Sequence, residues 1–249
     1  MWIRRPIYAA IWITAVVVSV GCGKSDYEQL MEKQLTTLGF SSKFIEALHP
    51  SPEPVVDGVA SLRLPTYISA EAQTLVLGQR NTRQEPIDPN RIQPPFGKIP
   101  GFRFAYERFI PMGGRNDFKP VYCYVATVPT KDASLKAIKS QIQKGASKAF
   151  KGAVWQTVDL DTPDGGKLKY EKMSLRGPQP FHTNPAGGDI EQLPGQCDFY
   201  VRSSKDFHVI IAFRAPDEVN DQLNTFEAAE YAMGTLAIEQ LEEADASNS

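Results

Sequence analysis

Val209-Ile-Ile-Ala-Phe213 is a run of apolar residues with no polar residue between them. A strand without the usual apolar–polar alternation is typical of the centre of a sheet whose two faces are both covered. The segment before it, Cys197-Asp-Phe-Tyr-Val-Arg-Ser203, also has the composition of a strand, and a short polar turn ending at Asp206 separates the two. The sequence therefore predicts a β-hairpin near the middle of a covered sheet.

The segments before this hairpin predict further strands joined by turns. Phe102–Ile110 alternates between apolar and polar residues, and Pro111–Asp117 turns the chain back into the apolar segment Val121–Val128. Another hairpin is centred on Thr162-Pro-Asp-Gly-Gly166, because proline fixes one backbone torsion and glycine permits a positive one. The remaining strands are expected at residues 59–67, 73–78, 154–160 and 168–173.

Two segments have the residue spacing of amphipathic helices. Lys131–Phe150 places Ile138 and Ile142 on one face and most of its lysines outside that face. Asp217–Glu242 is expected to form one closing helix that packs residues such as Phe226 onto the sheet. Antiparallel strands followed by helices predict the α+β class, a mainly antiparallel β-sheet covered by two amphipathic helices.

The order of these elements resembles that of the PsbP/Mog1-like α/β/α sandwich. In that family a helix follows the first strands, several antiparallel strands come next, and a C-terminal helix packs back onto the sheet. The resemblance covers residues 59–243 and lies in element order alone. It therefore implies a fold and no particular function.

Proline and low periodicity mark the segments between the elements. Residues 79–101 contain five prolines and residues 175–196 show little periodicity, so both are expected to be long loops. His49–Gly58 is expected to be a stiff tether, because proline restricts the backbone. We accordingly divide the chain into a signal peptide (1–21), an anchor with a short helix and a proline-rich tether (22–58), one α+β domain (59–243) and a disordered tail (244–249).

The N-terminus has the pattern of an export signal. Arg4 and Arg5 precede an uncharged apolar run, Ile7–Val20, that is shorter than the roughly 20 residues of a spanning helix. The run ends in Val18-Ser-Val-Gly-Cys-Gly23, which resembles the lipobox of bacterial lipoproteins, although serine replaces the usual large aliphatic residue at position 19. The resemblance implies lipidation of Cys22 and a membrane anchor that faces the periplasm or the cell exterior. Cleavage by an ordinary signal peptidase and an uncleaved anchor remain open.

Two cysteines remain once Cys22 is acylated. Cys123 and Cys197 both lie in expected strands, and each alternates with aliphatic or aromatic neighbours. In an oxidising compartment such a pair is expected to form a disulfide bond, with two buried thiols as the alternative.

The composition and the motifs argue against several functions. The net charge of −2 gives no basic excess for nucleic acid. Hydrolase signatures are absent, and His49, His182 and His208 do not share metal-ligand spacing, so we expect neither a metal nor another cofactor. Polar and aromatic residues gather in the second long loop, which makes it a candidate ligand site: Arg176, Phe181, His182 and Asp189.

Two functional hypotheses follow. The first is a non-enzymatic, lipid-anchored envelope module that binds another envelope protein or a small ligand. The second is an extracytoplasmic enzyme with a dispersed carboxylate/His site on the 175–196 loop, assisted by Glu107 or Asp198. Converging carboxylates or His182 in a concave pocket would favour the enzyme.

Overall fold

The fold is α+β with mainly antiparallel sheets, as predicted. The computed structural model describes residues 38–238 apart from residues 40, 57, 69–71, 81–86, 88, 115–116 and 186–189. A seven-stranded antiparallel sheet has the strand order β3-β4-β5-β9-β8-β7-β6. Its strands are β3 (Gln73–Leu75), β4 (Phe102–Pro111), β5 (Phe118–Pro129), β6 (Gln156–Asp161), β7 (Lys167–His182), β8 (Ile190–Ser203) and β9 (Phe207–Pro216).

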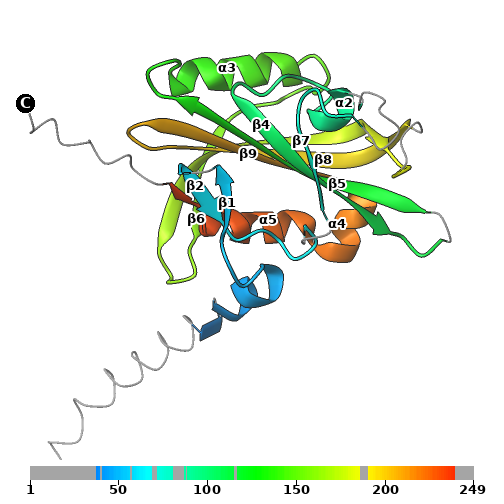
Figure 1. Cartoon of the computed structure of the whole chain (residues 1–249), viewed down its shortest axis with the longest axis horizontal. Helices are drawn as coiled ribbons and strands as arrows, with labels where there is room; N and C mark the ends of the chain where they lie inside the picture. The colour runs from blue at the N-terminus through cyan, green and yellow to red at the C-terminus, as the bar shows by residue number, and fades with distance from the viewer. Residues whose placement is uncertain are drawn as a thin grey trace, which may run out of the picture.

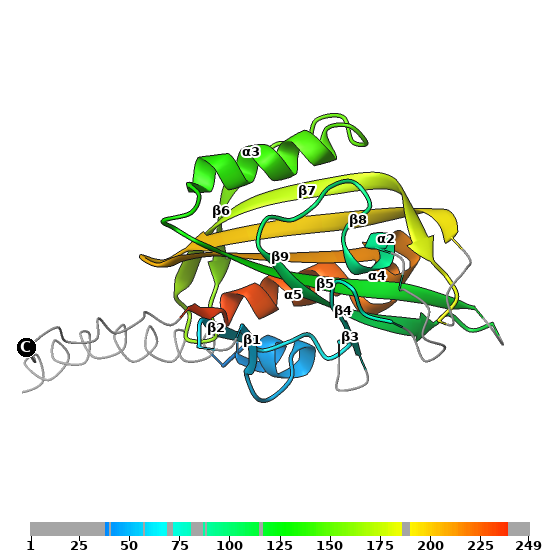
Figure 2. The ribbon, with the colours of Figure 1, turned by 45° about the horizontal axis from the view of Figure 1, so that its top comes forward.

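Helices and a smaller sheet cover both faces of this sheet (Figure 1). Helix α3 lies on one face, whereas α4, α5 and the smaller sheet lie on the other (Figure 2). The helices are α2 (Pro89–Ile92), α3 (Leu135–Ala146), α4 (Asp217–Leu223) and α5 (Thr225–Gly234). The smaller sheet is formed by β1 (Glu53–Val56), β2 (Ala60–Leu62) and β10 (Ala237–Ile238) in the order β1-β2-β10.

Strand β9 occupies the centre of the large sheet, as its apolar run predicts. Every residue of β9 after Phe207 is buried. Successive side chains of a strand point to opposite faces, so Ile210 contributes to the core beneath α3 and Ile211 to the core beneath α4 and α5. The continuous apolar pattern of β9 therefore reflects two separate cores.

The predicted hairpins are confirmed, and one further hairpin was missed. β4 pairs with β5, β6 with β7, and β8 with β9. The prediction of a loop at residues 175–196 is wrong, because β7 and β8 continue as paired strands through most of this segment. Its prolines suggested a loop, yet Pro178 and Pro194 lie opposite each other within the ladder.

The closing helix is not continuous, which corrects the prediction of one helix over residues 217–242. Asn224 separates α4 from α5 and has a φ of 49°. Asparagine is one of the few residues other than glycine that adopt this left-handed conformation readily. Within the described residues α5 ends at Gly234, and Ala237 and Ile238 then pair with β2.

The expected start of the domain at residue 59 is also wrong. Glu53–Val56, which we assigned to the tether, forms β1, and Val55 is fully buried. Phe44 and Leu48 belong to the core beneath α4 and α5, so the folded body begins within the helical segment 41–47. The signal segment, Cys22 and the tail lie outside the described residues, in which no helix is long and apolar enough to cross a membrane.

The predicted disulfide between Cys123 and Cys197 is wrong, because the two thiols are free and lie on opposite faces of the sheet. Cys123 lies opposite Phe213 and Cys197 lies opposite Arg214 on the strand between them. Adjacent residues of β9 point in opposite directions, so the sheet itself separates the two sulfur atoms. Alternation shows which residues of its own strand share a face with each cysteine. It does not show whether the two cysteines, on different strands, lie on the same face of the sheet.

Both thiols are therefore expected to resist labelling in the folded protein. Burial raises the pKa of Cys123 and of Cys197, which suppresses the reactive thiolate. Unfolding in denaturant without reductant should make both cysteines react fully with a maleimide, as counted by intact mass. A pair that labels only after reduction would contradict the assignment of free thiols.

Candidate functional site

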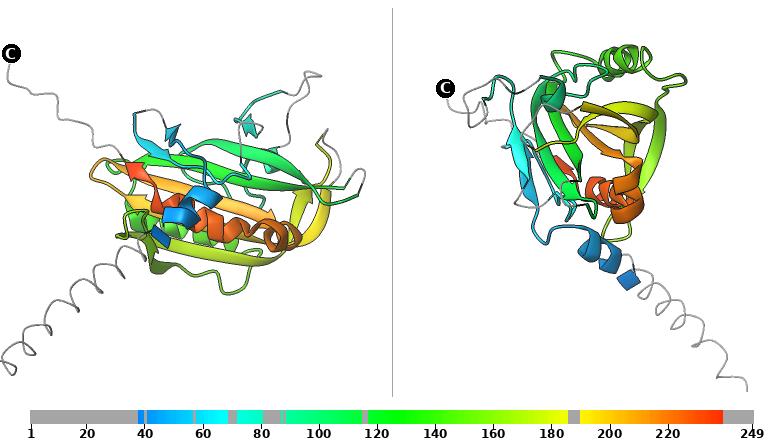
Figure 3. Two further views of the ribbon diagram at one scale, coloured as in Figure 1. Left: turned by 90° about the horizontal axis from the view of Figure 1, so that it is seen from below. Right: turned by 90° about the vertical axis from the view of Figure 1, so that its right-hand side faces the viewer.

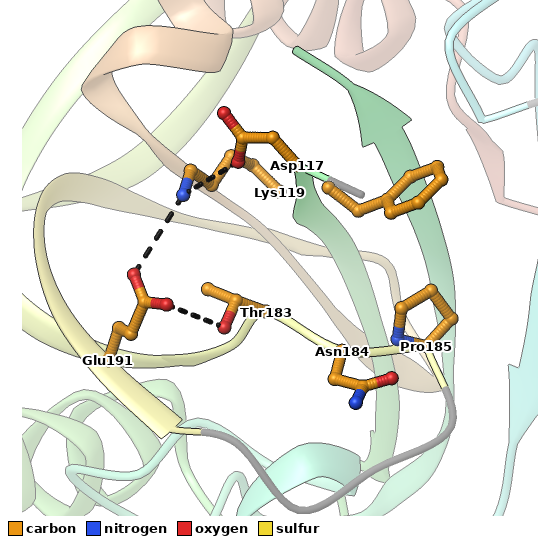
Figure 4. Close-up of a pocket in the computed structure, with 7 residues that line it drawn as sticks. Asp117, Lys119, Thr183, Asn184, Pro185 and Glu191 are labelled. Carbon is orange, nitrogen blue, oxygen red and sulfur yellow. Dashed lines mark hydrogen bonds and ion pairs between the residues drawn. The ribbon is translucent and has the colours of Figure 1, made fainter. Parts of the chain in front are cut away.

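A pocket of about 370 Å³ lies where β5 begins and where β7 and β8 meet (Figure 4). We call it the hairpin pocket. Two of its lining residues belong to β5, one belongs to β8, and the others lie next to β5 or follow β7. Its lining residues are Asp117, Phe118, Lys119, Thr183, Asn184, Pro185 and Glu191.

Lys119 lies between two carboxylates in this pocket. Its Nζ is 3.0 Å from Oδ1 of Asp117 and 3.8 Å from Oε2 of Glu191. The lysine side chain is 12% exposed, whereas those of Asp117 and Glu191 are 42% and 52% exposed. The ammonium group is thus the inner group, and both carboxylates reach solvent.

The surroundings of Lys119 carry more negative than positive charge. Partial burial lowers the pKa of Lys119, but the hydrogen bond and the charge of Asp117, with the charges of Glu191 and Glu218, raise it above its ordinary value overall. Lys119 is therefore a permanent cation at neutral pH. It offsets only one of the three neighbouring carboxylates.

The other polar and apolar groups complete the pocket. The hydroxyl of Thr183 donates a 3.0 Å hydrogen bond to Oε1 of Glu191, which orients that carboxylate. Phe118 and Pro185 supply the apolar part of the lining. Asn184 is an amide that can donate and accept hydrogen bonds. The pocket lining therefore combines charged, polar and apolar groups.

A buried ion pair lies behind the Pro185 side of the pocket. The guanidinium of Arg91 makes hydrogen bonds of 2.7 Å, 2.8 Å and 2.5 Å to the carboxylate of Glu107. Their side chains are only 9% and 1% exposed. Arg91 also donates a 3.4 Å hydrogen bond to the carbonyl oxygen of Pro185. The pair thus connects α2 and β4 to the pocket wall.

The ion pair continues as a buried polar row across the sheet. Glu107, Tyr122 and Arg214 are direct cross-strand neighbours on β4, β5 and β9. The guanidinium of Arg214 lies 4.1 Å from the ring centroid of Phe181. It donates hydrogen bonds to the side chain of Gln179 and to the carbonyl oxygen of Pro180. Arg214 forms no ion pair with a carboxylate of the described residues. The hydroxyl of Tyr122 is buried without a hydrogen-bond partner there.

Asp198 belongs to a separate network under α5. Its Oδ2 lies 2.9 Å from Nζ of Lys172, which is also 2.7 Å from Glu230. Asp198 lies opposite Phe213, whereas Glu107 belongs to the row that contains Arg214, so the two carboxylates occupy opposite faces of the sheet. Lys172 and Asp198 tie β7 and β8 to α5.

The structure does not gather the sequence-predicted ligand residues in one site. Arg176 is exposed on β7, whereas Phe181 is fully buried against Arg214. His182 is buried next to the pocket residue Thr183 without lining the pocket, and Asp189 lies outside the described residues. Glu107 and Asp198 lie on opposite faces of the sheet, neither lines the pocket, and the described residues contain no group of three or more metal-binding side chains.

Comparison with known proteins gives only distant likenesses. No protein-family model and no curated protein matches the chain. The crystal structure of LpqN, which is involved in cell envelope biogenesis of Mycobacterium tuberculosis, is 13% identical with a TM-score of 0.36, over 78% of this chain and 92% of LpqN. The solution structure of cyanobacterial PsbP from Synechocystis is 9% identical with a TM-score of 0.35, over 78% of this chain and 94% of that one. At these TM-scores no property of either protein transfers to this chain.

Proposed function

We propose that this protein is an exported, non-enzymatic binding module, anchored by lipid on Cys22, that holds a small cationic ligand in the hairpin pocket. The observation that carries the proposal is the pair of solvent-facing carboxylates, Asp117 and Glu191, that flank Lys119 in a hollow of about 370 Å³. Its size is within the range of small-molecule sites, roughly 300–1,000 Å³.

Charge and shape favour a ligand with an ammonium group and a short apolar part. The single positive charge of Lys119 does not neutralise all the carboxylates around it, so the pocket keeps an excess of negative charge that a ligand cation would offset. The carboxylates, which already contact Lys119, are exposed enough to accept further charge-assisted hydrogen bonds from that ligand cation. Phe118 and Pro185 offer apolar surface in the same pocket, against which a hydrocarbon segment would lose contact with water.

The arrangement of the polar groups favours binding over catalysis. The competing enzyme hypothesis placed a dispersed carboxylate/His site on the 175–196 segment, with carboxylates such as Glu107 or Asp198, and neither these two nor His182 lines the pocket. The pocket does bring together two carboxylates, Asp117 and Glu191, but both lie against the ammonium group of Lys119. Glu107 is paired with the buried Arg91, and Asp198 with Lys172, which also contacts Glu230. Removing Glu107 would leave a buried charge unpaired, and Asp198 links β8 to β7 and α5, which fits a structural role for both residues.

Calorimetric titration with putrescine, a diamine with a short hydrocarbon chain, tests the proposed ligand class. We expect saturable binding to the full-length protein and none to succinate, the matched dianion. Asp117→Asn combined with Glu191→Gln should weaken putrescine binding at least tenfold, because each charge-assisted hydrogen bond contributes about 1.5–3 kcal/mol.

The matched control removes two carboxylates from elsewhere on the protein. Asp159→Asn combined with Asp164→Asn changes the net charge equally but lies on the β6–β7 hairpin. This control variant should bind putrescine with an affinity within about twofold of that of the unsubstituted protein. Equal losses in both variants would indicate non-specific attraction to an acidic protein, and binding of succinate alone would refute the cationic ligand class.

The anchor is tested separately from the pocket. Export and lipidation are supported by the charged start, the apolar run and the lipobox-like sequence that ends at Cys22. Protein extracted from membranes should begin at an acylated Cys22 by intact mass, and Cys22→Ala should release it into the soluble fraction. An unmodified mature protein that begins at Cys22 and is soluble without any substitution would contradict lipid anchoring.

A further inference from the structure

The segment around α3 concentrates positive charge on a protein that is weakly acidic overall. Residues 131–151 contain six lysines and one aspartate, whereas the whole chain has a net charge of −2. Lys136, Lys144 and Lys148 are exposed, and none of them forms an ion pair with another described residue. Helix α3 therefore presents unneutralised ammonium groups to solvent.

A groove lined by Lys136, one of these lysines, also contains apolar side chains. It has a volume of about 680 Å³ and lies between α3 and the segment that leads into β6. Val154 is 52% exposed there, and it is followed by the partly exposed Trp155. We call this the α3 groove, lined by Leu135, Lys136, Lys139, Ser140, Gln143, Val154 and Trp155.

The walls of the groove are fixed by hydrogen bonds. The indole nitrogen of Trp155 donates to the carbonyl oxygen of Lys139 over 3.0 Å, and Gln143 donates to the carbonyl oxygen of Ala153 over 2.7 Å. Lys139 lies 5.7 Å from the centre of the Trp155 ring and is paired with Glu171. The indole is thus held in place before any partner binds, which lowers the entropic cost of association.

We propose that the α3 groove is the docking site for an acidic segment of a partner protein. An apolar side chain of that segment packs against Val154 and Trp155, while its carboxylates face Lys136 and Lys144. A rigid tryptophan beside a pocket is the type of residue that dominates binding energy in protein interfaces. The surrounding lysines steer an acidic partner and fix its register.

Two observations favour a protein segment over an anionic bilayer. The surface is a groove, which accepts an inserted side chain, whereas a flat membrane contact needs a projecting apolar face. In addition, residues 41–47, through which the chain enters the fold, lie on the other side of the large sheet from α3 (Figure 3). The α3 groove therefore lies on the opposite side of the sheet from the point where the N-terminal segment, and with it the proposed lipid anchor, joins the folded body.

Tryptophan fluorescence reports directly on this groove. The chain has three tryptophans, Trp2, Trp12 and Trp155. The first two lie in the proposed signal peptide, so the mature protein retains only the groove indole, and Trp2→Phe with Trp12→Phe gives the same single indole in uncleaved protein. The probe is the blocked peptide Glu-Glu-Leu-Glu-Glu, compared with Glu-Glu-Ala-Glu-Glu and Lys-Lys-Leu-Lys-Lys. We expect a saturable change in Trp155 emission with the first peptide, at least threefold weaker binding of the second and no response to the third.

Charge reversal on the groove provides the decisive comparison. Lys136→Glu with Lys144→Glu should weaken binding of the acidic peptide at least tenfold. The matched variant Lys167→Glu with Lys169→Glu, at exposed positions of β7, should change it less than twofold. Circular dichroism confirms that both variants remain folded.

The alternatives give distinct results. No saturable response to the acidic peptide, or equal loss in both charge-reversal variants, would overturn the proposal. A shift of Trp155 emission on phosphatidylglycerol vesicles but not on phosphatidylcholine vesicles, without a response to the peptide, would assign the surface to the membrane instead. None of these results depends on whether the hairpin pocket binds putrescine.

Discussion

Replacing Glu107 by alanine is expected to lower the free energy of unfolding by about 3–5 kcal/mol. The substitution leaves the guanidinium of Arg91, 9% exposed in the native protein, without its carboxylate. Taking a cation out of water without compensation is costly, and the same change frees the segment that carries α2 from β4. Chemical denaturation followed by circular dichroism measures the loss.

Two further variants separate the buried pair from general effects of charge removal. Lys167→Ala removes an exposed ion pair, in which Lys167 and Asp161 are 3.9 Å apart, and should cost at most about 1 kcal/mol. Arg91→Leu with Glu107→Leu should destabilise the protein less than Glu107→Ala alone, because neither charge is then left unpaired. A loss below 1 kcal/mol for Glu107→Ala would contradict the buried arrangement.

Replacing Gly101 by alanine is expected to cost about 3 kcal/mol or more. Gly101 has a φ of 65°, which side-chain-bearing residues rarely adopt. An added Cβ would lie 2.1 Å from the carbonyl oxygen of Thr127, a backbone atom that cannot rotate away. The same residues are linked by a 3.0 Å hydrogen bond from the Thr127 amide to the Gly101 carbonyl, so a shift would also disturb this contact.

Gly58→Ala is a matched control for the backbone conformation. Gly58 has a φ of 64°, but an added Cβ there would meet no atom within 4 Å. It should therefore cost only about 1–2 kcal/mol, the strain of the left-handed conformation. Thermal and chemical denaturation give the free energy of unfolding of both variants, and their difference is the cost of the close approach of Gly101 to Thr127. Equal losses of stability in the two variants would contradict that close approach.

The central features of the fold follow from local sequence patterns. The apolar run that ends at Phe213 predicts a strand with two covered faces, and Thr162–Gly166 predicts a hairpin turn from its torsional preferences. Features that depend on how neighbouring strands pair are harder to predict from the sequence. Alternation placed Cys123 and Cys197 correctly in strands, but their relative face depends on the register of β9, which neither segment encodes.

Breaks and extensions of elements were harder to predict for a related reason. Asn224 lies within an otherwise helical pattern, and its left-handed conformation ends α4 there although the flanking residues continue the apolar spacing of a helix. The prolines of β7 and β8 lowered the expected strand length, although pairing in the ladder tolerates them at this end. Val55 was assigned to a tether because its burial depends on the distant partner strand β2.

The hairpin pocket was not predictable from any single stretch of the chain. Lys119 and Glu191 are distant in sequence and meet only because β5 begins, and the β7–β8 hairpin turns, at the same end of the sheet. The sequence did draw attention to His182, and the pocket begins at the next residue, Thr183. Once residues 175–196 are known to form a hairpin, the candidate ligand groups are expected near its turn, where Thr183 and Glu191 lie, and not along the paired strands.

A titration of the isotope-labelled protein with putrescine, followed by amide chemical shifts, tests the proposed function most directly. We expect concentration-dependent shifts that saturate and cluster at Asp117, Lys119, Thr183, Asn184 and Glu191, with little change along α3. The variant with Asp117→Asn and Glu191→Gln should lose these shifts while retaining the dispersed spectrum of a folded protein. Saturating shifts centred on another surface, or no shifts at any concentration, would contradict a cationic ligand site in the hairpin pocket.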